Sequence, residues 1–390
     1  MKKIVPFLLV ATLITANLSC DKEENESPTD TPKRTVIIYM AGDNALSNMV
    51  TSNIDSIKNN LEKTGNRQNL VIFADKKDHS PLLLQVTPQR IDTLKVFDEL
   101  NSADATTLSM VIKYVKDNYK TDSYGLLLWG HGMGWLPFSQ LHNVADNIGF
   151  APMRTTRTFA LEMRPNERPS YTSMEIDDMV NAIPDGLFEY IAFDACYMGC
   201  VEIMYALRNK ARYILSCCSE VISDGYPYQN VTSYLLDANL TEVCNGFYNY
   251  YNSMTGWEQM GDISLVKTEG LDSLAGCFKK IMAEYRQNIS QMNVDSVQCF
   301  DIYKKHVYYD LEDYLVKLGT KTEYLNEFRT QMEKCVIYRK STQYMFPGLS
   351  FREFEIKTYS GMSVYIPRQE YESSGLNAEY SKTEWYQHTN

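Results

Sequence analysis

The sequence predicts an α/β protein built around a mainly parallel sheet. Continuous apolar runs rich in β-branched residues alternate with segments of helical periodicity, a pattern typical of strands that helices cover on both faces. The 390 residues, 44% of them apolar, are enough to bury one large core of this kind. Because ligands bind at the carboxyl ends of parallel strands, we expect a functional site among the residues that follow these runs.

The first part of the chain supplies most of the predicted sheet. Buried strands are predicted at 35–43, 69–75, 124–130, 187–195 and 213–220, and a hairpin at 82–86 and 91–97. Helical periodicity occupies 45–63, 104–119, 173–183 and 198–208, and Asp104 is the expected cap of the second of these helices. The stretch 131–170 has no regular pattern and is expected to form a long irregular loop.

The last third of the chain is less regular. Strands are predicted at 261–267 and 361–367, and helices at 270–287 and 322–339. No linker-like composition separates this part from the rest. We therefore expect one domain over 35–390, in which the residues from about 260 form a subdomain packed on the main sheet.

The N-terminus has the pattern of an export signal. Residues 1–19 combine a basic start with an apolar stretch, as in a signal peptide, and Cys20 resembles the lipidated cysteine of bacterial lipoproteins. The polar, acidic segment 20–34 predicts a disordered tether and resembles the surface-export signal of some Gram-negative lipoproteins. Asn17 occupies the place where such lipoproteins usually carry leucine. We expect an outer-membrane or cell-surface lipoprotein held to the membrane through Cys20, with plain secretion as the alternative.

Charge and cysteine spacing exclude several classes. A net charge of −11 argues against a nucleic-acid partner. The eight cysteines after Cys20 are irregularly spaced and contain no C-x-x-C pair, which argues against a disulfide scaffold and a structural zinc site. We expect mostly buried free thiols.

Two side chains with nucleophile and base chemistry follow predicted strands. Cys196 lies at a strand-to-helix junction, where a helix N-terminus favours the thiolate, although a buried core cysteine is the alternative. His131 lies among glycines, which leave room for a ligand, although an ordinary loop histidine is the alternative. Because both residues end strands of one sheet, His131 is a candidate base for the Cys196 thiol. The amides of Gly132 and Cys196 would then stabilise an oxyanion.

Two other glycine-rich site types are not supported. The segment "GHGMGW" has Trp135 where a dinucleotide fingerprint needs glycine or alanine, and it does not open a helix. No G-x-S-x-G elbow for a serine nucleophile occurs.

The chain resembles the clostripain family of cysteine peptidases, in the caspase-like clan. The resemblance rests on "VIIYMAGDNALS", "LLLWGHGMGW", "FDACYMGCVEIMYAL" and "SEVISDGYPY", in this order, and on the later "VYYDLEDYL" and "GMSVYIP". It implies a caspase-like α/β/α sandwich with a C-terminal extension. It also implies Cys196 as nucleophile, His131 as general base and acid, and Gly132 as an oxyanion-hole glycine.

The resemblance further implies cleavage after Arg or Lys. It places Asp194 and Asp224 in the P1 pocket, where two carboxylates would bind a guanidinium. The alternative for Asp194 is the N-cap of the following helix, and the local Ser-Asp-Gly sequence by itself favours a turn residue for Asp224. A preference for Lys or for uncharged P1 residues remains an alternative.

Many relatives are zymogens that cut themselves in the loop after the histidine. Here that loop is 136–170, which contains no lysine and has as processing candidates Arg154, Arg157, Arg164 and Arg168. The alternative is a solvated loop with ordinary charges. The chemistry requires no cofactor. Some relatives need calcium, but no EF-hand-type loop occurs, so the metal site is unassigned.

These observations predict a secreted or lipid-anchored cysteine endopeptidase, active as a monomer on substrates with a basic P1 residue. The alternative is a catalytically silent surface-binding lipoprotein on a peptidase fold.

Overall fold

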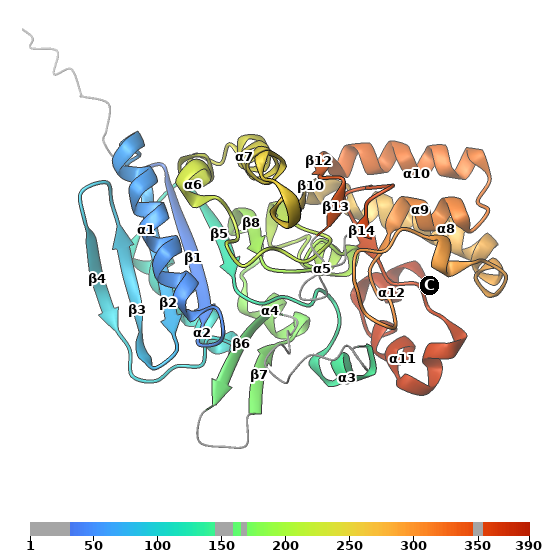
Figure 1. The fold of residues 1–390 in the computed structure, drawn as a ribbon, viewed down its shortest axis with the longest axis horizontal. Coiled ribbons are helices and arrows are strands. Elements are labelled where there is room, and N and C mark those ends of the chain that lie inside the picture. Colours follow the sequence, from blue (N-terminus) through green and yellow to red (C-terminus); the bar gives the residue numbers. More distant parts are fainter. Residues whose placement is uncertain (1–31, 145–158, 165–169, 346–353) are drawn as a thin grey trace, which may run out of the picture. The chain divides into compact units, whose positions relative to one another are not determined.

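A nine-stranded sheet organises the fold (Figure 1). The computed structural model describes residues 32–144, 159–164, 170–345 and 354–390. The sheet has the order β12-β10-β9-β8-β5-β1-β2-β3-β4. Its strands are β1 (Arg34–Gly42), β2 (Asn69–Lys76), β3 (His79–Val86), β4 (Ile91–Val96), β5 (Ser123–Trp129), β8 (Phe188–Asp194), β9 (Ala211–Ser216), β10 (Asp262–Lys267) and β12 (Val336–Ser341).

The centre of the sheet is parallel. Strands β9, β8, β5, β1 and β2 run in one direction, and antiparallel strands complete both sides, with β3 and β4 beyond β2 and with β10 and β12 beyond β9. The predicted mainly parallel α/β sheet is thus confirmed.

Both faces of the central strands are buried. In β1, Ile37 and Tyr39 belong to one hydrophobic core, whereas Val36 and Ile38 belong to the other. This alternation follows from the period of two along a strand, and it explains why the run is apolar throughout.

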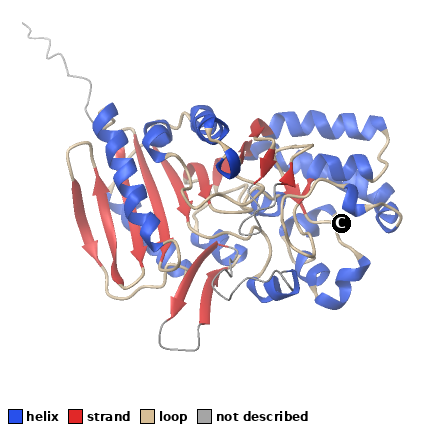
Figure 2. Cartoon of the chain, in the orientation of Figure 1, coloured by secondary structure: helices blue, strands red, loops and turns tan. Residues whose placement is uncertain are grey.

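Helices cover the two faces separately (Figure 2). One core contains buried residues of α1 (Ser47–Thr64), α6 (Tyr228–Leu236) and α7 (Leu240–Ser253). The other contains residues of α2 (Ala105–Asn118), α4 (Ile176–Ala182), α5 (Val201–Ala206), α8 (Leu271–Tyr285), α9 (Leu311–Lys317) and α10 (Thr322–Cys335). The result is the predicted α/β/α sandwich.

Helix ends follow the expected local chemistry. The Asp104 carboxylate caps α2 by accepting from the Thr106 amide at 2.8 Å. Helix α1 ends at Gly65, whose φ of 67° is left-handed and whose amide donates to Leu61 O.

Smaller elements surround the sheet. They comprise the pairs β6 (Phe159–Arg164) with β7 (Ser170–Met174), β11 (Tyr309–Asp310) with β15 (Ser363–Val364), and β13 (Tyr344–Met345) with β14 (Phe354–Glu355), and the helices α3 (Leu141–Val144), α11 (Leu376–Tyr380) and α12 (Glu384–Thr389).

Three predicted segments differ from the structure. The helix expected at 322–339 ends at Cys335, and Val336 begins β12, which pairs with β10 at the edge of the sheet. The strand expected at 361–367 is reduced to Ser363–Val364, which pairs with β11 outside the main sheet. The expected irregular stretch 131–170 contains α3 and β6.

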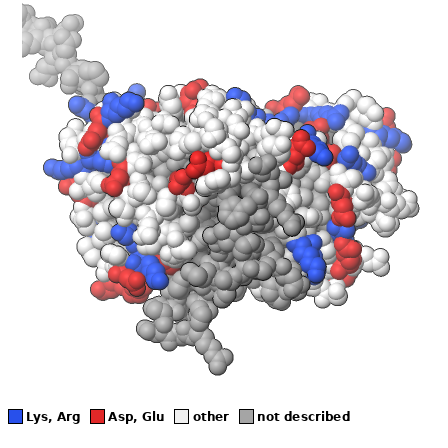
Figure 3. All heavy atoms as spheres, viewed as in Figure 1, with Lys and Arg blue, Asp and Glu red and all other residues white. Residues whose placement is uncertain are grey.

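Residues Pro32–Asn390 form one compact unit, to whose main sheet the C-terminal part contributes β10 and β12. Within the described ranges, no helix is both long and apolar enough to cross a membrane. Acidic and basic side chains are interspersed on the face shown in Figure 3. The eight described cysteines are all free, as expected, and only Cys196 and Cys299 are partly exposed.

Candidate active site

The register between β5 and β8 brings the two predicted catalytic segments together. Trp129 and Asp194 are the last paired residues of these parallel strands, and the Gly130 amide donates to Asp194 O at 3.2 Å. His131 lies two residues beyond Trp129, and Cys196 lies two residues beyond Asp194. The two chains therefore leave the sheet side by side, at the carboxyl ends of adjacent strands.

The backbone of Gly132 packs against Cys196. A Cβ atom at position 132 would lie 2.5 Å from Cys196 O and 3.1 Å from Cys196 N, so no larger residue fits there. The Ala160 amide donates to His131 O at 3.1 Å, and Gly132 pairs with Phe159. The start of β6 thus holds the segment that carries the partly exposed His131.

Cys196 occupies a turn rather than a helix N-terminus. Helix α5 begins only at Val201, with Cys200 at its cap position, so the expectation that a helix end favours the Cys196 thiolate was wrong. The Val221 amide donates to the Cys196 Sγ at 3.3 Å. Burial, and then the negative charge of Glu220, nevertheless raise the pKa of the Cys196 thiol. Both effects favour the thiol over the thiolate.

The residue after Cys196 has a strained backbone. Tyr197 has a φ of 61°, in the left-handed region that non-glycine residues rarely adopt. Its amide donates to Ser219 O at 3.1 Å, and its hydroxyl donates to Glu220 Oε1 at 2.9 Å. The segment after β9 therefore fixes the turn that presents the cysteine.

Asp194 holds the loop that contains Asp224. Its carboxylate is buried, and its Oδ2 accepts from the Tyr226 amide at 3.0 Å and from the Tyr228 hydroxyl at 2.7 Å. A Cβ atom on Gly225, whose φ is 67°, would lie 2.4 Å from the same oxygen. Asp194 is not the N-cap of the following helix, because α5 begins at Val201 with Cys200 at its cap position. Burial raises the pKa of this carboxyl group to about 6.

Asp224 is exposed on the same loop. The Gly225 amide donates to Ile222 O at 2.8 Å, which closes a tight turn with Asp224 at its outside. The Tyr251 hydroxyl donates to Gly225 O and supports the turn from α7. Asp224 is thus exposed to solvent, whereas the buried Asp194 holds the loop that carries Asp224.

The family model for the clostripain family matches residues 38–390. The chain belongs to the clostripain family. It is therefore a cysteine endopeptidase, and the predicted caspase-like α/β fold is confirmed by its structural relatives. A comparison with curated proteins finds no match.

Three solved structures illustrate the relationship. An inactive zymogen C11 protease from Parabacteroides distasonis is 33% identical with a TM-score of 0.79, and the match covers 92% of this chain and 98% of that one. The secreted C11 cysteine protease "iotapain" from Bacteroides thetaiotaomicron is 25% identical with a TM-score of 0.78, over 92% and 100% of the two chains. A clostripain from B. thetaiotaomicron in complex with the peptide inhibitor BTN-VLTK-AOMK is 27% identical with a TM-score of 0.50, over 58% and 98%.

Several predicted residues of this clostripain-family chain fall outside the described part. These are Cys20, Arg154, Arg157 and Arg168, whereas Arg164 is the last residue of β6. Among the described residues, no group of three or more His, Cys, Asp or Glu side chains is arranged to hold a metal ion.

The sequence did not predict the residues that hydrogen-bond to Tyr197 and Asp194 next to the candidate site. Tyr226 and Tyr228 lie in "SDGYPY", a segment that carried the family resemblance, yet their hydrogen bonds to Asp194 follow only from the fold. Glu220 lies in the quoted segment "SEVISDGYPY", yet its hydrogen bond from the Tyr197 hydroxyl likewise follows only from the fold.

We expect Asp194→Asn to remove a pH dependence of stability. The folded-state pKa of about 6 lies above the ordinary value of 3.8, so the unfolded chain releases this proton at lower pH than the folded one. The contribution of Asp194 to the free energy of unfolding should therefore fall, by on the order of 2 kcal/mol, as pH rises from about 4 to about 6.

Urea denaturation between about pH 4 and 7 measures this contribution as the difference in free energy of unfolding between wild type and variant. The difference should change between about pH 4 and about pH 6 and level off towards pH 7. A difference that is independent of pH would contradict the prediction.

Proposed function

We propose that this chain cleaves peptide bonds after Arg, with Cys196 as the nucleophile and His131 as its base and acid. The supporting observation is the shared register of β5 and β8, which leaves His131 and Cys196 at adjacent strand ends with Gly132 against Cys196. Such a pair is the minimum that thiol catalysis requires.

In the proposed reaction, the imidazole of His131 takes the thiol proton as the Cys196 sulfur attacks the scissile carbonyl carbon. The Gly132 and Cys196 amides stabilise the resulting oxyanion. The imidazolium then gives its proton to the leaving amine, and the C–N bond breaks to leave an acyl-enzyme. Water, deprotonated by His131, attacks the thioester, and the sulfur leaves as the acid product forms.

The raised pKa of the Cys196 thiol sets the demand on His131. A thiol that is protonated at neutral pH needs a base at the moment of attack, because only the thiolate is an effective nucleophile. In this proposal the histidine is required for the chemical step and does more than orient the sulfur.

Asp224 is the proposed direct partner of the P1 guanidinium, since it is exposed at the tip of the loop 222–228. Asp194 is buried and accepts two hydrogen bonds from that loop, so its role is to hold the loop and to add negative charge beneath it. The relative whose inhibitor sequence VLTK ends in lysine supports a basic P1 residue. Arg and Lys are both compatible with this site, and the charge-assisted, bidentate bonding of a guanidinium favours Arg.

We further propose that the chain is exported and anchored through a lipid on Cys20. The apolar segment before Cys20 and the relative described as secreted support export. A relative described as an inactive zymogen supports activation by self-cleavage within 136–170. We also propose that the protein binds calcium, for which no ligands are assigned.

Cys196→Ala and His131→Ala should each abolish hydrolysis of Arg-linked peptide substrates. Loss of the nucleophile or its base should lower kcat by at least about 10⁴-fold. A fluorogenic Arg peptide measures the rate, and the circular dichroism spectrum checks that each variant folds. Residual activity near the wild-type level would reject the dyad and would favour the alternative of a silent binding protein.

Asp224→Asn should lower kcat/KM for an Arg substrate by about tenfold, because one charged hydrogen bond to the guanidinium is lost. Asp237→Asn, another exposed aspartate that lies outside the loop, is the matched control. A substrate with an uncharged P1 residue should not distinguish the two variants. Equal kinetics of Asp224→Asn and wild type would remove Asp224 from the pocket.

Self-cleavage should occur only in the active protein. Intact-mass analysis should show fragments that end at Arg154, Arg157, Arg164 or Arg168 for wild type, and a single uncut chain for Cys196→Ala. Identical cleavage of both proteins would assign the cut to another protease.

A further inference from the structure

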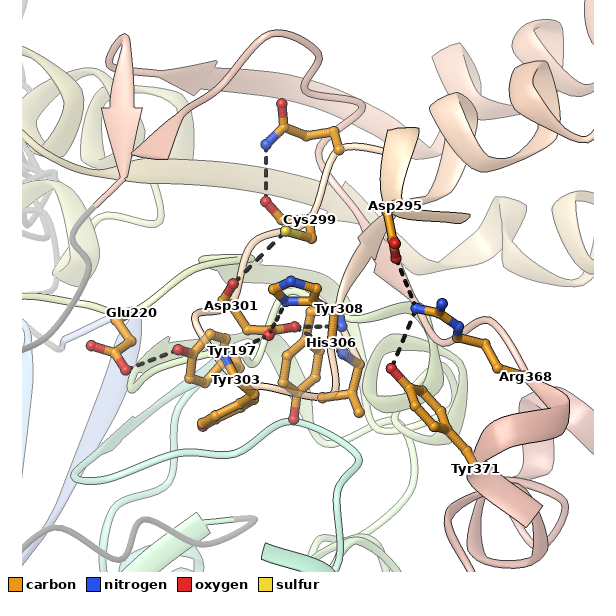
Figure 4. A network of polar contacts seen from close by, with 12 residues as sticks. Tyr197, Glu220, Asp295, Cys299, Asp301, Tyr303, His306, Tyr308, Arg368 and Tyr371 are labelled. Atoms are coloured by element: carbon orange, nitrogen blue, oxygen red, sulfur yellow. Dashed lines mark hydrogen bonds and ion pairs between the residues drawn. The ribbon is translucent and has the colours of Figure 1, made fainter. Parts of the chain in front are cut away.

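A buried carboxylate organises a turn in the C-terminal part of the chain. We call residues 299–309 the Asp301 turn. Asp301 is fully buried, and each of its carboxylate oxygens accepts two hydrogen bonds (Figure 4). The donors are the amides of Tyr303 (3.0 Å), Val307 (2.9 Å) and Tyr308 (2.9 Å) and the Nδ1 of His306 (2.8 Å).

His306 supplies the compensating charge. Burial lowers its pKa, but hydrogen bonds to Asp301 and Cys299 and the charge of Asp301 raise it more, to about 11. The buried carboxylate is thus both neutralised and fully hydrogen-bonded, which is the condition for a rigid polar turn.

The Asp301 turn contacts the segment that follows His131. The Tyr308 hydroxyl donates to Met133 O, and the Tyr303 hydroxyl donates to Met133 Sδ at 3.1 Å. The indole of Trp135 donates to Val307 O at 3.5 Å.

The same two tyrosines contact the turn that presents Cys196. The ring of Tyr308 stacks on the ring of Tyr197 with centroids 4.7 Å apart and an interplanar angle of 7°. The Tyr303 ring lies tilted against Tyr197 at 5.7 Å (Figure 4).

The three segments meet at Gly134. A Cβ atom there would lie 2.9 Å from Tyr308 Cε1 and 2.6 Å from Tyr197 O, and the glycine has a φ of 53°. The close packing of this glycine therefore couples the His131 segment to both the Cys196 turn and Tyr308.

We propose that the Asp301 turn is a positioning element that holds the His131 segment and the Cys196 turn in fixed relation, with Tyr308 as the principal positioning residue. The proposal rests on the proposed dyad, whose two groups lie beyond the ends of their strands. The sheet register fixes only where these two segments begin. Contacts on their far side are needed to hold the imidazole and the sulfur at reacting distance, where a misplacement of about 1 Å can cost about 100-fold in rate.

Tyr308→Phe tests this role, because it keeps the stacked ring and removes only the hydroxyl that binds Met133 O. We expect kcat for an Arg peptide to fall by on the order of tenfold, with KM unchanged, since Tyr308 contacts Met133 and Tyr197 beside the proposed dyad rather than the loop that carries Asp224. The split between kcat and KM separates mispositioned catalytic groups from a damaged substrate pocket.

Tyr190→Phe is the matched control. Tyr190 is also fully buried, and its hydroxyl donates to a backbone carbonyl, Leu235 O, at 2.9 Å, on the side of the sheet covered by α6. Both variants should lower the melting temperature, and only Tyr308→Phe should lower kcat at a temperature where both are folded.

The outcomes are distinct. Wild-type kcat in folded Tyr308→Phe, or an equal loss of kcat in Tyr190→Phe, would overturn the positioning role. If Tyr308→Phe does not fold, Tyr303→Phe replaces it, with a smaller loss of kcat expected and wild-type kcat again overturning the proposal. Hydrolysis that survives Cys196→Ala would instead defeat the proposed function on which this inference rests.

Discussion

The parallel register between β5 and β8 is the constraint on which the rest of the site depends. Tyr190, Ala192 and Asp194 point to the face covered by α6 and α7, where Asp194 meets its tyrosine partners. A shift of one residue would turn that carboxylate into the opposite apolar core and move Gly132 away from Cys196. Burial of both faces therefore fixes the strand register, and the same register aligns the residues of the candidate site.

Much of the fold could be predicted because buried parallel strands leave a strong local signal. The apolar runs at β1, β2, β5, β8 and β9 are continuous, and both of their faces are covered. The errors lie where the local pattern carries less information. The helical periodicity continued beyond Cys335, although the residues that follow it form β12 and pair with β10. The segment around β15 was predicted as a core strand, but only two of its residues pair, with β11. In both places long-range pairing decides the structure.

The sequence indicated a candidate site but not its environment. Strand ends and glycines indicated His131, Gly132 and Cys196, because a parallel sheet gathers such ends at one edge. The environment of the sulfur could not be inferred, since the turn before α5 separates Cys196 from the helix. The contacts of Tyr303 and Tyr308 could not be inferred either, because their partners Met133 and Tyr197 lie far away in the chain.

The burial of the thiols has a consequence for the proposed export of the protein. Among the described cysteines, those enclosed in the two cores are Cys200, Cys217, Cys218, Cys244, Cys277 and Cys335. An oxidant that diffuses in the surrounding medium meets these sulfurs only when the native packing opens, so their chemical lifetime is set by the rate of unfolding. If the proposed export is correct, a cysteine peptidase that needs one reduced sulfur can thus keep its other thiols reduced in an oxidising environment.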